Sequence, residues 1–332
     1  MADLLRDKVA VITGAGRGLG RAFAMAMARE GARVLVNDLG CDVEGLGHDP
    51  APADEVVAEI RALGGTAVAD YESIETSAGA ERIMAAALRH FGRIDILVAN
   101  AGTLTHGMVW EMGDESWERM VRININGTFY CARAACRVMK DQGWGRIIVN
   151  SSGAGLGVTH EVAYATVKEA QIGMARTIAK DMLAHGVTCN VLRPRAAATR
   201  LAHTPLIHAA RRKTLNEAEY AAWERERAAQ SPEKIAPLAV YLCTEHAAAI
   251  TGCIFDMREN YIAIYDEPPR FARSVVKPAG PWEVDELIQV LPDTLLRELP
   301  PLAPTVLRRM MPDAKSWEWR DGALRETAPL LR

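Results

Sequence analysis

Residues 13–20 read Thr-Gly-Ala-Gly-Arg-Gly-Leu-Gly and decide the expected fold of this 332-residue chain. The apolar run Val9–Thr13 leads into them, and a helical stretch near Arg21–Glu30 follows. Glycines let the backbone turn tightly and approach a pyrophosphate, and the N-terminus of the next helix offers unpaired N–H groups. The stretch therefore predicts a strand–turn–helix unit that binds a dinucleotide, although a flexible turn would explain the glycines alone.

Short apolar runs alternate with longer helical stretches through most of the chain. Most of the runs are apolar on both faces, which is typical of strands covered by helices on each side. This alternation predicts a doubly wound parallel sheet. The further expected strands are Arg33–Asn37, Thr66–Asp70, Ile94–Ala99, Arg146–Asn150, Thr188–Leu192 and Cys253–Met257. The further expected helices are Pro52–Leu63, Gly79–His90, Ser116–Met139 and Val162–His185.

Two segments fall outside this alternation. Residues 195–231 are rich in alanine and charge, with helical periodicity, and we expect them to form a lid. Residues 1–260 then form one dinucleotide-binding and catalytic domain, and residues 261–332 form a C-terminal extension. Helix-like patches at Glu283–Leu291 and Thr305–Met311 and several tryptophans give the extension apolar surface. We expect it to dock on the core or on a neighbouring subunit.

Composition excludes several classes of function. The formal net charge is −3, so no basic excess favours nucleic-acid binding. No apolar run reaches the roughly 18 residues of a membrane span. The six cysteines form no CxxC pair and have no histidine cluster beside them, so neither a metal site nor a disulfide framework is expected. The N-terminus lacks a signal-peptide layout, and a cytoplasmic location is the default expectation.

An acidic residue closes the second expected strand. Asp38 lies 18 residues after Gly20, near the spacing of the carboxylate that binds an adenosine ribose. A carboxylate accepts hydrogen bonds from both ribose hydroxyls and repels a 2′-phosphate. The residue therefore favours NAD(H) over NADP(H), while Arg17 is a weaker signal in the opposite direction.

Tyr164 and Lys168 stand four residues apart and should share one helix face. A phenol ionises near pH 10, and a neighbouring ammonium together with oxidised nicotinamide would favour the phenolate. Tyr164 could then act as an acid or a base near neutral pH. A YxxxK pair alone is common by chance, but its surroundings support a site. Ser151 lies 13 residues before Tyr164, Asn124 lies in the preceding helix, and Asn100-Ala101-Gly102 follows the fourth strand.

Together these motifs resemble the short-chain dehydrogenase/reductase family over about residues 5–260. The chain is most similar to an NAD-dependent branch related to the dehydrogenase domain of peroxisomal multifunctional hydroxyacyl-CoA enzymes. The resemblance implies a Rossmann-type fold, a small alcohol or ketone substrate, and a homodimer or homotetramer. No nucleic-acid or membrane partner is implied.

The resemblance also implies roles for individual residues. Tyr164 exchanges the hydroxyl proton, Lys168 steadies the phenolate and binds the nicotinamide ribose, and Asn124 holds a water beside Lys168. Ser151 holds the substrate oxygen, its only rival being Ser152, and the 13-residue spacing favours Ser151. The implied cofactor contacts are Gly14, Gly16, Arg17, Gly18, Leu19, Gly20, Asp38, Glu72, Ser73, Asn100, Ala101, Gly102, Tyr164, Lys168 and Thr199. Asp70 is the alternative to Glu72 as the acidic residue near adenine.

The chain departs from the family pattern beyond the sixth strand. Arg195 replaces the usual glycine after Pro194, which leaves the register of Thr199 open, and Arg258-Glu259-Asn260 replaces the terminal Gly-Gly. Arg195 is either an anion contact or a surface arginine. The leading function is an NAD(H)-dependent dehydrogenase of a fairly apolar secondary alcohol: a hydroxyacyl thioester, a steroid or terpenoid alcohol, or an aromatic alcohol. The alternatives are an NADPH-dependent biosynthetic ketoreductase and a nucleotide-binding scaffold or sensor on the same fold.

Overall fold

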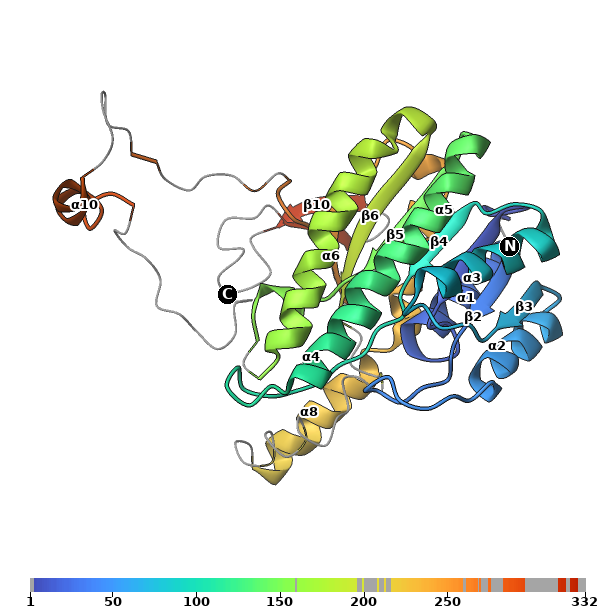
Figure 1. The fold of residues 1–332 in the computed structure, drawn as a ribbon, viewed down its shortest axis with the longest axis horizontal. Helices are drawn as coiled ribbons and strands as arrows, with labels where there is room; N and C mark the ends of the chain where they lie inside the picture. Colours follow the sequence, from blue (N-terminus) through green and yellow to red (C-terminus); the bar gives the residue numbers. More distant parts are fainter. Residues whose placement is uncertain are drawn as a thin grey trace. The chain divides into compact units, whose positions relative to one another are not determined.

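The computed structural model describes residues 3–158, 160–195, 199, 208, 212, 216–258, 261–267, 269, 274–275, 283–295, 316–320 and 323–327. Its main sheet has the strand order β3-β2-β1-β4-β5-β6-β7-β8 (Figure 1). All neighbours are parallel except β7 and β8. The predicted doubly wound sheet is confirmed. The strands are β1 (Val9–Thr13), β2 (Arg33–Asn37), β3 (Thr66–Asp70), β4 (Ile96–Ala99), β5 (Gly145–Asn150), β6 (Val187–Pro194), β7 (Ile254–Arg258) and β8 (Tyr261–Ile264).

The helices follow the predicted order with one irregularity. The stretch predicted as a single helix over Ser116–Met139 is divided by a π-helical turn. The helical elements of the part of this unit that the structure describes are α1 (Gly18–Arg29), α2 (Ala51–Ala62), α3 (Ser77–Phe91), α4 (Asp114–Met120), π-helix η1 (Val121–Gly127), α5 (Thr128–Gln142), η2 (Gly153–Leu156), α6 (Val162–Asp181), η3 (Leu183–His185), α8 (Glu217–Ala229), η5 (Pro232–Lys234), α9 (Ala236–Leu242) and η6 (Glu245–Ala247).

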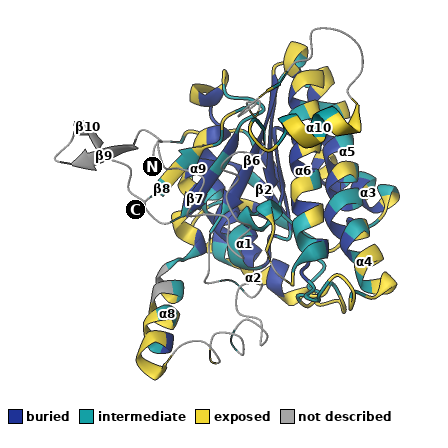
Figure 2. Cartoon of the chain, turned by 90° about the vertical axis from the view of Figure 1, so that its left-hand side faces the viewer, coloured by how far each residue is buried: buried dark blue, intermediate teal, exposed yellow. Residues whose placement is uncertain are grey.

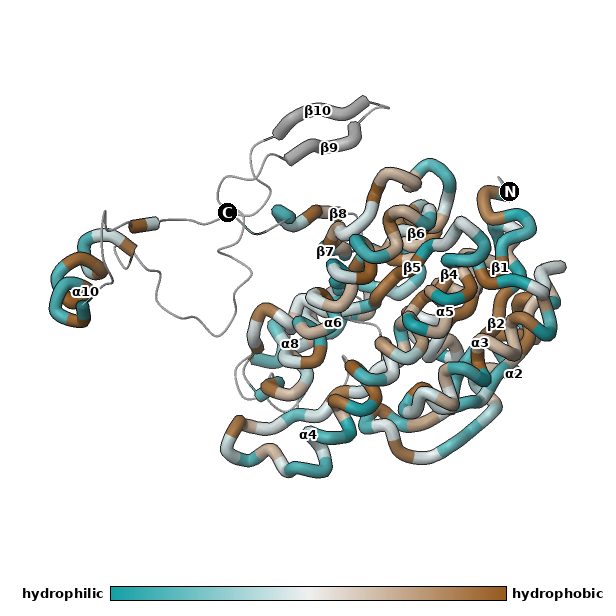
Figure 3. Tube along the Cα trace, turned by 45° about the horizontal axis from the view of Figure 1, so that its top comes forward, coloured by the Kyte–Doolittle hydropathy of each residue, from teal (hydrophilic) through white to brown (hydrophobic). Residues whose placement is uncertain are grey.

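Alternating side chains of the strands build two apolar cores, one on each face of the sheet. Val11, Leu35 and Leu97 pack with the buried side chains of α3, α5 and α6. Ile12 and Val36 point the other way and pack with those of α1, α2 and α9. Figure 2 shows the strands buried between these helices, and Figure 3 shows hydrophobic residues along them. Each such side chain contributes about 1.5–3 kcal/mol on burial, so the two cores fix the register of the sheet.

The chain divides into two compact units after Tyr265. Strand β8 belongs to the first unit, which therefore ends five residues beyond the predicted boundary at 260. The described helix and strands of the second unit are α10 (Val284–Val290) and the antiparallel pair β9 (Ser316–Arg320) and β10 (Ala323–Thr327). The predicted patch at 305–311 lies outside the described residues, and docking of the extension stays a prediction. Among the described helices, none is long and apolar enough to cross a membrane.

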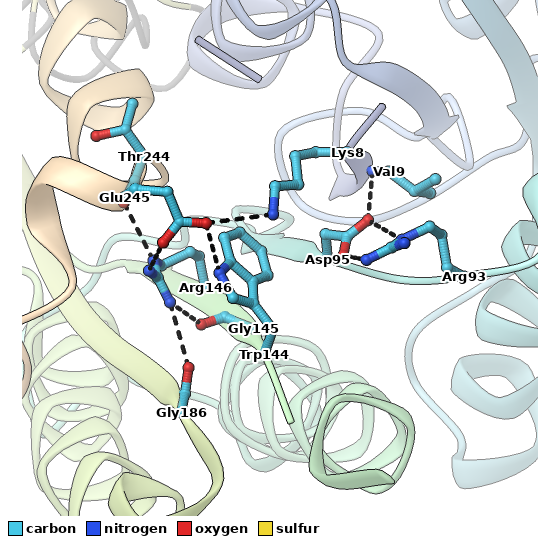
Figure 4. Close-up of polar contacts among 10 residues, drawn as sticks. All are labelled: Lys8, Val9, Arg93, Asp95, Trp144, Gly145, Arg146, Gly186, Thr244 and Glu245. Atoms are coloured by element: carbon cyan, nitrogen blue, oxygen red, sulfur yellow. Dashed lines mark hydrogen bonds and ion pairs between the residues drawn. The ribbon is translucent and has the colours of Figure 1, made fainter. Parts of the chain in front are cut away.

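Polar groups close the sheet at the amino ends of its strands, opposite the edge where a ligand would bind (Figure 4). The fully buried Asp95 accepts a hydrogen bond from the Val9 N–H at 2.8 Å and binds Arg93 through both carboxylate oxygens. Nearby, the buried guanidinium of Arg146 lies 4.3 Å from the ring centre of Trp144 and ion-pairs with Glu245 at 3.4 Å. These contacts join the start of β1 to the segments that lead into β4 and β5.

Replacing Asp95 should destabilise the fold more than replacing an exposed partner in an ion pair. Asp95→Ala leaves a buried N–H and a guanidinium without their acceptor, so we expect the free energy of unfolding to fall by about 2–4 kcal/mol. Glu81→Ala removes a solvent-exposed pair with Arg137 and should cost about 1 kcal/mol or less. Urea-induced unfolding followed by circular dichroism measures both, and equal losses would contradict a structural role for Asp95.

Candidate functional site

A cleft of about 730 Å³ opens at the carboxyl ends of the parallel strands. The strand order reverses its direction of growth between β1 and β4, and ligands bind at such a switch point in open α/β sheets. The structure brings fourteen of the predicted site residues to this cleft: Gly14, Arg17, Gly18, Leu19, Asp38, Glu72, Ser73, Asn100, Ala101, Gly102, Ser151, Tyr164, Lys168 and Thr199. Gly16, Gly20 and Asn124 lie behind its wall.

The glycine loop at one end of the cleft has no room for side chains. A Cβ on Gly14 would approach the Ala101 Cα to 2.8 Å, and one on Gly20 would approach the Gly14 carbonyl oxygen to 2.0 Å. Gly18 adopts φ +53°, a left-handed conformation that favours glycine. Helix α1 begins here, and no described side chain caps it. Bare backbone and an uncapped helix N-terminus fit a pyrophosphate, which would supply the missing acceptors.

The Asp38 carboxylate is held in place at the end of β2. One oxygen accepts the Gly16 N–H and the other accepts the Gly40 N–H, both at 2.7 Å. A Cβ on Gly16 would lie 2.9 Å from this carboxylate, which explains glycine at that position. The Arg17 guanidinium turns instead to the Cys41 carbonyl at 3.4 Å and to Asp49 at 3.8 Å. The charged group that is held against the glycine loop is therefore the Asp38 carboxylate, and not the Arg17 guanidinium.

Next to Asp38, the cleft wall near β3 distinguishes the two acidic candidates of the sequence. Asp70 accepts the Asn37 side-chain N–H at 2.7 Å and the Glu72 backbone N–H at 3.1 Å, so its carboxylate orders the loop. Glu72 and Ser73 line the cleft, and the Glu72 carboxylate binds Arg82 through both oxygens. This arrangement favours Glu72 and Ser73 over Asp70 as neighbours of a bound ligand.

A ladder of polar groups links the ends of β1, β4 and β5. The Thr13 hydroxyl accepts the backbone N–H groups of Asn100 and Ala101, each at 3.1 Å. The Asn100 amide donates to the carbonyls of Thr13 and Gly14 at 3.0 Å, and its oxygen accepts the Asn150 amide at 2.8 Å. The sequence analysis missed Asn150, whose position at the end of an apolar strand was the available signal.

Tyr164 and Lys168 share one face of α6 and border the cleft, with the Lys168 ammonium 5.6 Å from the tyrosine ring centre. The ammonium is buried and donates to the Asn150 carbonyl at 2.9 Å. Burial lowers the pKa of Lys168 to about 8. The pKa of Tyr164 is raised to about 12, mainly by burial and to a smaller extent by the charge of Glu161. In the protein alone, desolvation outweighs the phenolate stabilisation that the sequence led us to expect from Lys168.

Ser152, and not Ser151, makes contact with the tyrosine. The Ser152 hydroxyl hydrogen-bonds Tyr164 and thereby lowers the pKa of the phenol against the effect of burial. The Ser151 hydroxyl donates to the backbone carbonyl of Lys168 at 2.7 Å, and only 3% of Ser151 is exposed. Ser151 stays a prediction as the oxygen-binding hydroxyl, and this geometry favours its rival Ser152. The 13-residue spacing assumes a fixed length for the loop from β5 to α6. It also cannot decide between two adjacent residues, because successive side chains after a strand point to opposite sides.

Asn124 lies in the π-helical turn η1 and is fully buried behind the cleft. Its side-chain oxygen accepts the Thr103 N–H at 3.3 Å, and a Cβ on Gly102 would lie 2.6 Å from that oxygen and 3.6 Å from the Lys168 ammonium. Gln171, which the sequence analysis missed, donates to the Asn124 carbonyl at 2.9 Å. A wider turn frees backbone carbonyls for such contacts, and π-turns are frequent at functional sites.

The substrate end of the cleft departs from the expected pattern. Arg195 binds Asp256 through two hydrogen bonds of 3.2 and 3.1 Å, so its charge is already paired within the sheet. The Thr199 methyl lies 3.6 Å from a Cβ built on Gly18, which places Thr199 beside the glycine loop. Arg227 and Gln230 reach the cleft from α8 and the residue after it. Residues 196–198 and 200–207 of the predicted lid lie outside the described residues.

The lowered pKa of Lys168 predicts a pH-dependent contribution to stability. The unfolded chain holds this proton up to about pH 10.5 and the folded chain only to about pH 8, so the folded state gains stability as pH rises between these values. Relative to Lys168→Met, the wild type should gain up to about 3 kcal/mol in unfolding free energy over this range. Urea unfolding of both proteins at pH 7.5, 9 and 10.5 measures the difference. A difference that does not change with pH would contradict the shift.

Comparisons with known proteins identify the family of the chain. The family model described as short chain dehydrogenase matches residues 8–206. Peroxisomal multifunctional enzyme type 2 of Mus musculus is 38% identical over 265 residues, 79% of this chain but 33% of the mouse protein. A short-chain type dehydrogenase/reductase of Mycobacterium tuberculosis is 38% identical over 245 residues, 74% of this chain and 80% of that protein.

A crystal structure of a short chain dehydrogenase from Mycobacterium avium superposes with a TM-score of 0.74 at 30% identity, over 90% of this chain and 98% of that one. This chain thus spans about a third of the mouse enzyme and most of the mycobacterial proteins. Fold, cleft and comparisons lead to one conclusion: the chain is an oxidoreductase of the short-chain dehydrogenase family.

Proposed function

We propose that the protein is an NAD(H)-dependent oxidoreductase that interconverts a fairly apolar secondary alcohol and its ketone. The observation that carries the proposal is that Tyr164, Ser152, Lys168 and Asp38 all line one cleft. A proton-transfer group, an oxygen-binding hydroxyl, a buried cation and a ribose-binding carboxylate together meet the needs of alcohol oxidation. A nucleotide-binding scaffold would not need the first three.

Each residue has a separate task in this proposal. In oxidation, the phenolate form of Tyr164 accepts the proton of the substrate hydroxyl, and in reduction the phenol form returns that proton to the ketone oxygen. Ser152 donates a hydrogen bond to the same oxygen. Lys168, held by the Asn150 carbonyl, keeps a positive charge near the phenol below about pH 8. A bound nicotinamide would supply or accept the hydride.

The residues that line the rest of the cleft support an apolar substrate. Leu104, Ala154 and Val158 are among the lining residues, and Val158 is exposed. Apolar side chains that face a cleft gain free energy when a hydrocarbon group covers them. Direction and cofactor choice rest on Asp38, whose fixed carboxylate disfavours a 2′-phosphate.

The two serines should differ sharply in their effect on turnover. Ser152→Ala removes a donor to the reacting oxygen, so we expect kcat/KM to fall about 100-fold or more. The rise of oxidation rate with pH should also move to higher pH, since Ser152 lowers the pKa of Tyr164. Ser151→Ala should stay within about threefold of wild type and lose about 1 kcal/mol of stability. NADH absorbance with the best alcohol of a panel, at pH 6–10, measures both.

Tyr164→Phe controls for the chemistry, because it should abolish turnover and still bind NADH, as followed by fluorescence. Full activity in this variant would exclude the proposed mechanism. Equal losses in the two serine variants would reassign the oxygen-binding hydroxyl.

Cofactor preference should depend on Asp38. Asp38→Ala removes the like charge that opposes a 2′-phosphate, so the ratio of kcat/KM with NADP(H) to that with NAD(H) should rise by roughly 100-fold. Glu55→Ala, an exposed acidic residue on α2, is the matched control and should leave the ratio unchanged. Steady-state rates with both cofactors give the ratio, and wild-type preference for NADP(H) would refute the NAD(H) assignment.

A further inference from the structure

A carboxylate that the proposed chemistry does not use faces the substrate end of the cleft. Glu161 caps the start of α6, one turn before Tyr164, and lines the cleft wall. Its side chain is only 15% exposed. Residues three apart on a helix lie on one face, about 5–6 Å apart between Cβ atoms. A substrate whose carbinol oxygen contacts Tyr164 therefore lies within reach of Glu161.

The Glu161 carboxylate has no hydrogen-bond donor in the described part of the chain. The nearest cationic group there, the His106 Nδ1, lies 3.9 Å away, which is beyond hydrogen-bond distance. Burial lowers the pKa of His106 and so favours its neutral form. Burial likewise raises the pKa of Glu161, as expected for a carboxylate that has lost water without gaining a donor. Leaving such a group unsatisfied costs free energy, which a bound donor would recover.

Backbone contacts fix the main chain that carries this carboxylate. His160 adopts φ +68°, a left-handed conformation that is uncommon for a residue other than glycine. Its carbonyl accepts the Gly107 N–H at 2.8 Å, and Gly107 pairs with Glu161 in a short parallel bridge. Strained residues of this kind persist where the surrounding structure fixes them, and they gather at binding sites. The backbone of Glu161 is thus fixed, and its side chain extends from a defined point on the largely buried cleft wall.

We propose that Glu161 determines substrate specificity by accepting a hydrogen bond from the substrate, whose preferred class carries a second hydroxyl one or two carbons from the carbinol carbon. This inference rests on the proposed function and names its substrate class more closely. An apolar body with one such donor satisfies both the apolar cleft wall and the carboxylate. An analogue without the second hydroxyl would leave the carboxylate buried without a donor, and sites built in this way reject such analogues.

Matched pairs of alcohols test the assignment: 1-phenylethane-1,2-diol against 1-phenylethanol, and octane-2,4-diol against octan-2-ol. We expect wild type to favour the diol of a pair by at least about tenfold in kcat/KM. Glu161→Leu should bring the ratio near one, and Glu161→Gln, whose amide oxygen still accepts a hydrogen bond, should give an intermediate ratio. Glu118→Leu, at an exposed position on α4, is the control and should keep the wild-type ratio.

The outcomes separate the two levels of the proposal. Equal rates on both members of each pair, or a ratio unchanged in Glu161→Leu, would overturn the role of Glu161 and leave the dehydrogenase assignment standing. Absence of turnover with every alcohol and with the matching ketones, while NADH still binds, would overturn the proposed function and this inference with it. Circular dichroism of each variant shows that it is folded, and the Gln variant decides the matter if the Leu variant is not.

Discussion

The polar ladder from Thr13 through Asn100 to Asn150 is the contact on which the rest of the site depends. Apolar packing fixes which strands are neighbours, but it is tolerant of small shifts, whereas hydrogen bonds near 3 Å are directional. The ladder ties the glycine loop after β1 to the end of β5. Because the Asn150 carbonyl then accepts the Lys168 ammonium, the cofactor loop and the catalytic helix share one reference point.

The burial of Lys168 and Tyr164 lowers the stability of the fold but favours the proposed proton transfer. Burial shifts the pKa of Lys168 and the pKa of Tyr164 in the directions that favour the neutral side chains. This desolvation does not stabilise the folded protein without a ligand. Because water is excluded, the electrostatic interaction between this pair and any approaching charge is stronger. Asp95 and Arg146, at the opposite edge of the sheet, show the structural alternative, in which buried charges are fully engaged by fixed partners.

Much of the fold could be predicted because its signals are local. Apolar runs covered on both faces gave strands β1, β2 and β3 at their observed bounds and the others to within about two residues. Strand β8, which pairs antiparallel with β7, was missed because Arg258-Glu259-Asn260 stands before it where the family has a glycine pair. The π-turn was missed because one extra residue in a turn hardly changes an apolar pattern that spans 24 positions.

The site residues also divide into those whose arrangement follows from local sequence spacing and those whose arrangement does not. Glycines, Asp38 and the Tyr164–Lys168 pair stand at spacings that a helix or a turn enforces, so their arrangement follows from sequence. The choice between Ser151 and Ser152 depends on the length of a loop and on which way each side chain points, and spacing to Tyr164 cannot decide either. Asp70 and Arg195 have partners that are distant in sequence, so only the folded chain shows that these charges are paired, whereas Glu161 has no donor among the described residues.

The π-turn η1 has a consequence for how Asn124 reaches the wall of the cleft. A regular helix turns about 100° per residue, so one additional residue rotates everything before the turn relative to everything after it. Helix α4 and the buried face of α5 therefore follow two different phases along a single continuous rod. If evolution removed one residue from this segment, the rod would become a regular helix, and either Asn124 or the apolar face of α5 would turn away from its partners. The length of this stretch is thus constrained as tightly as the identity of any residue in it.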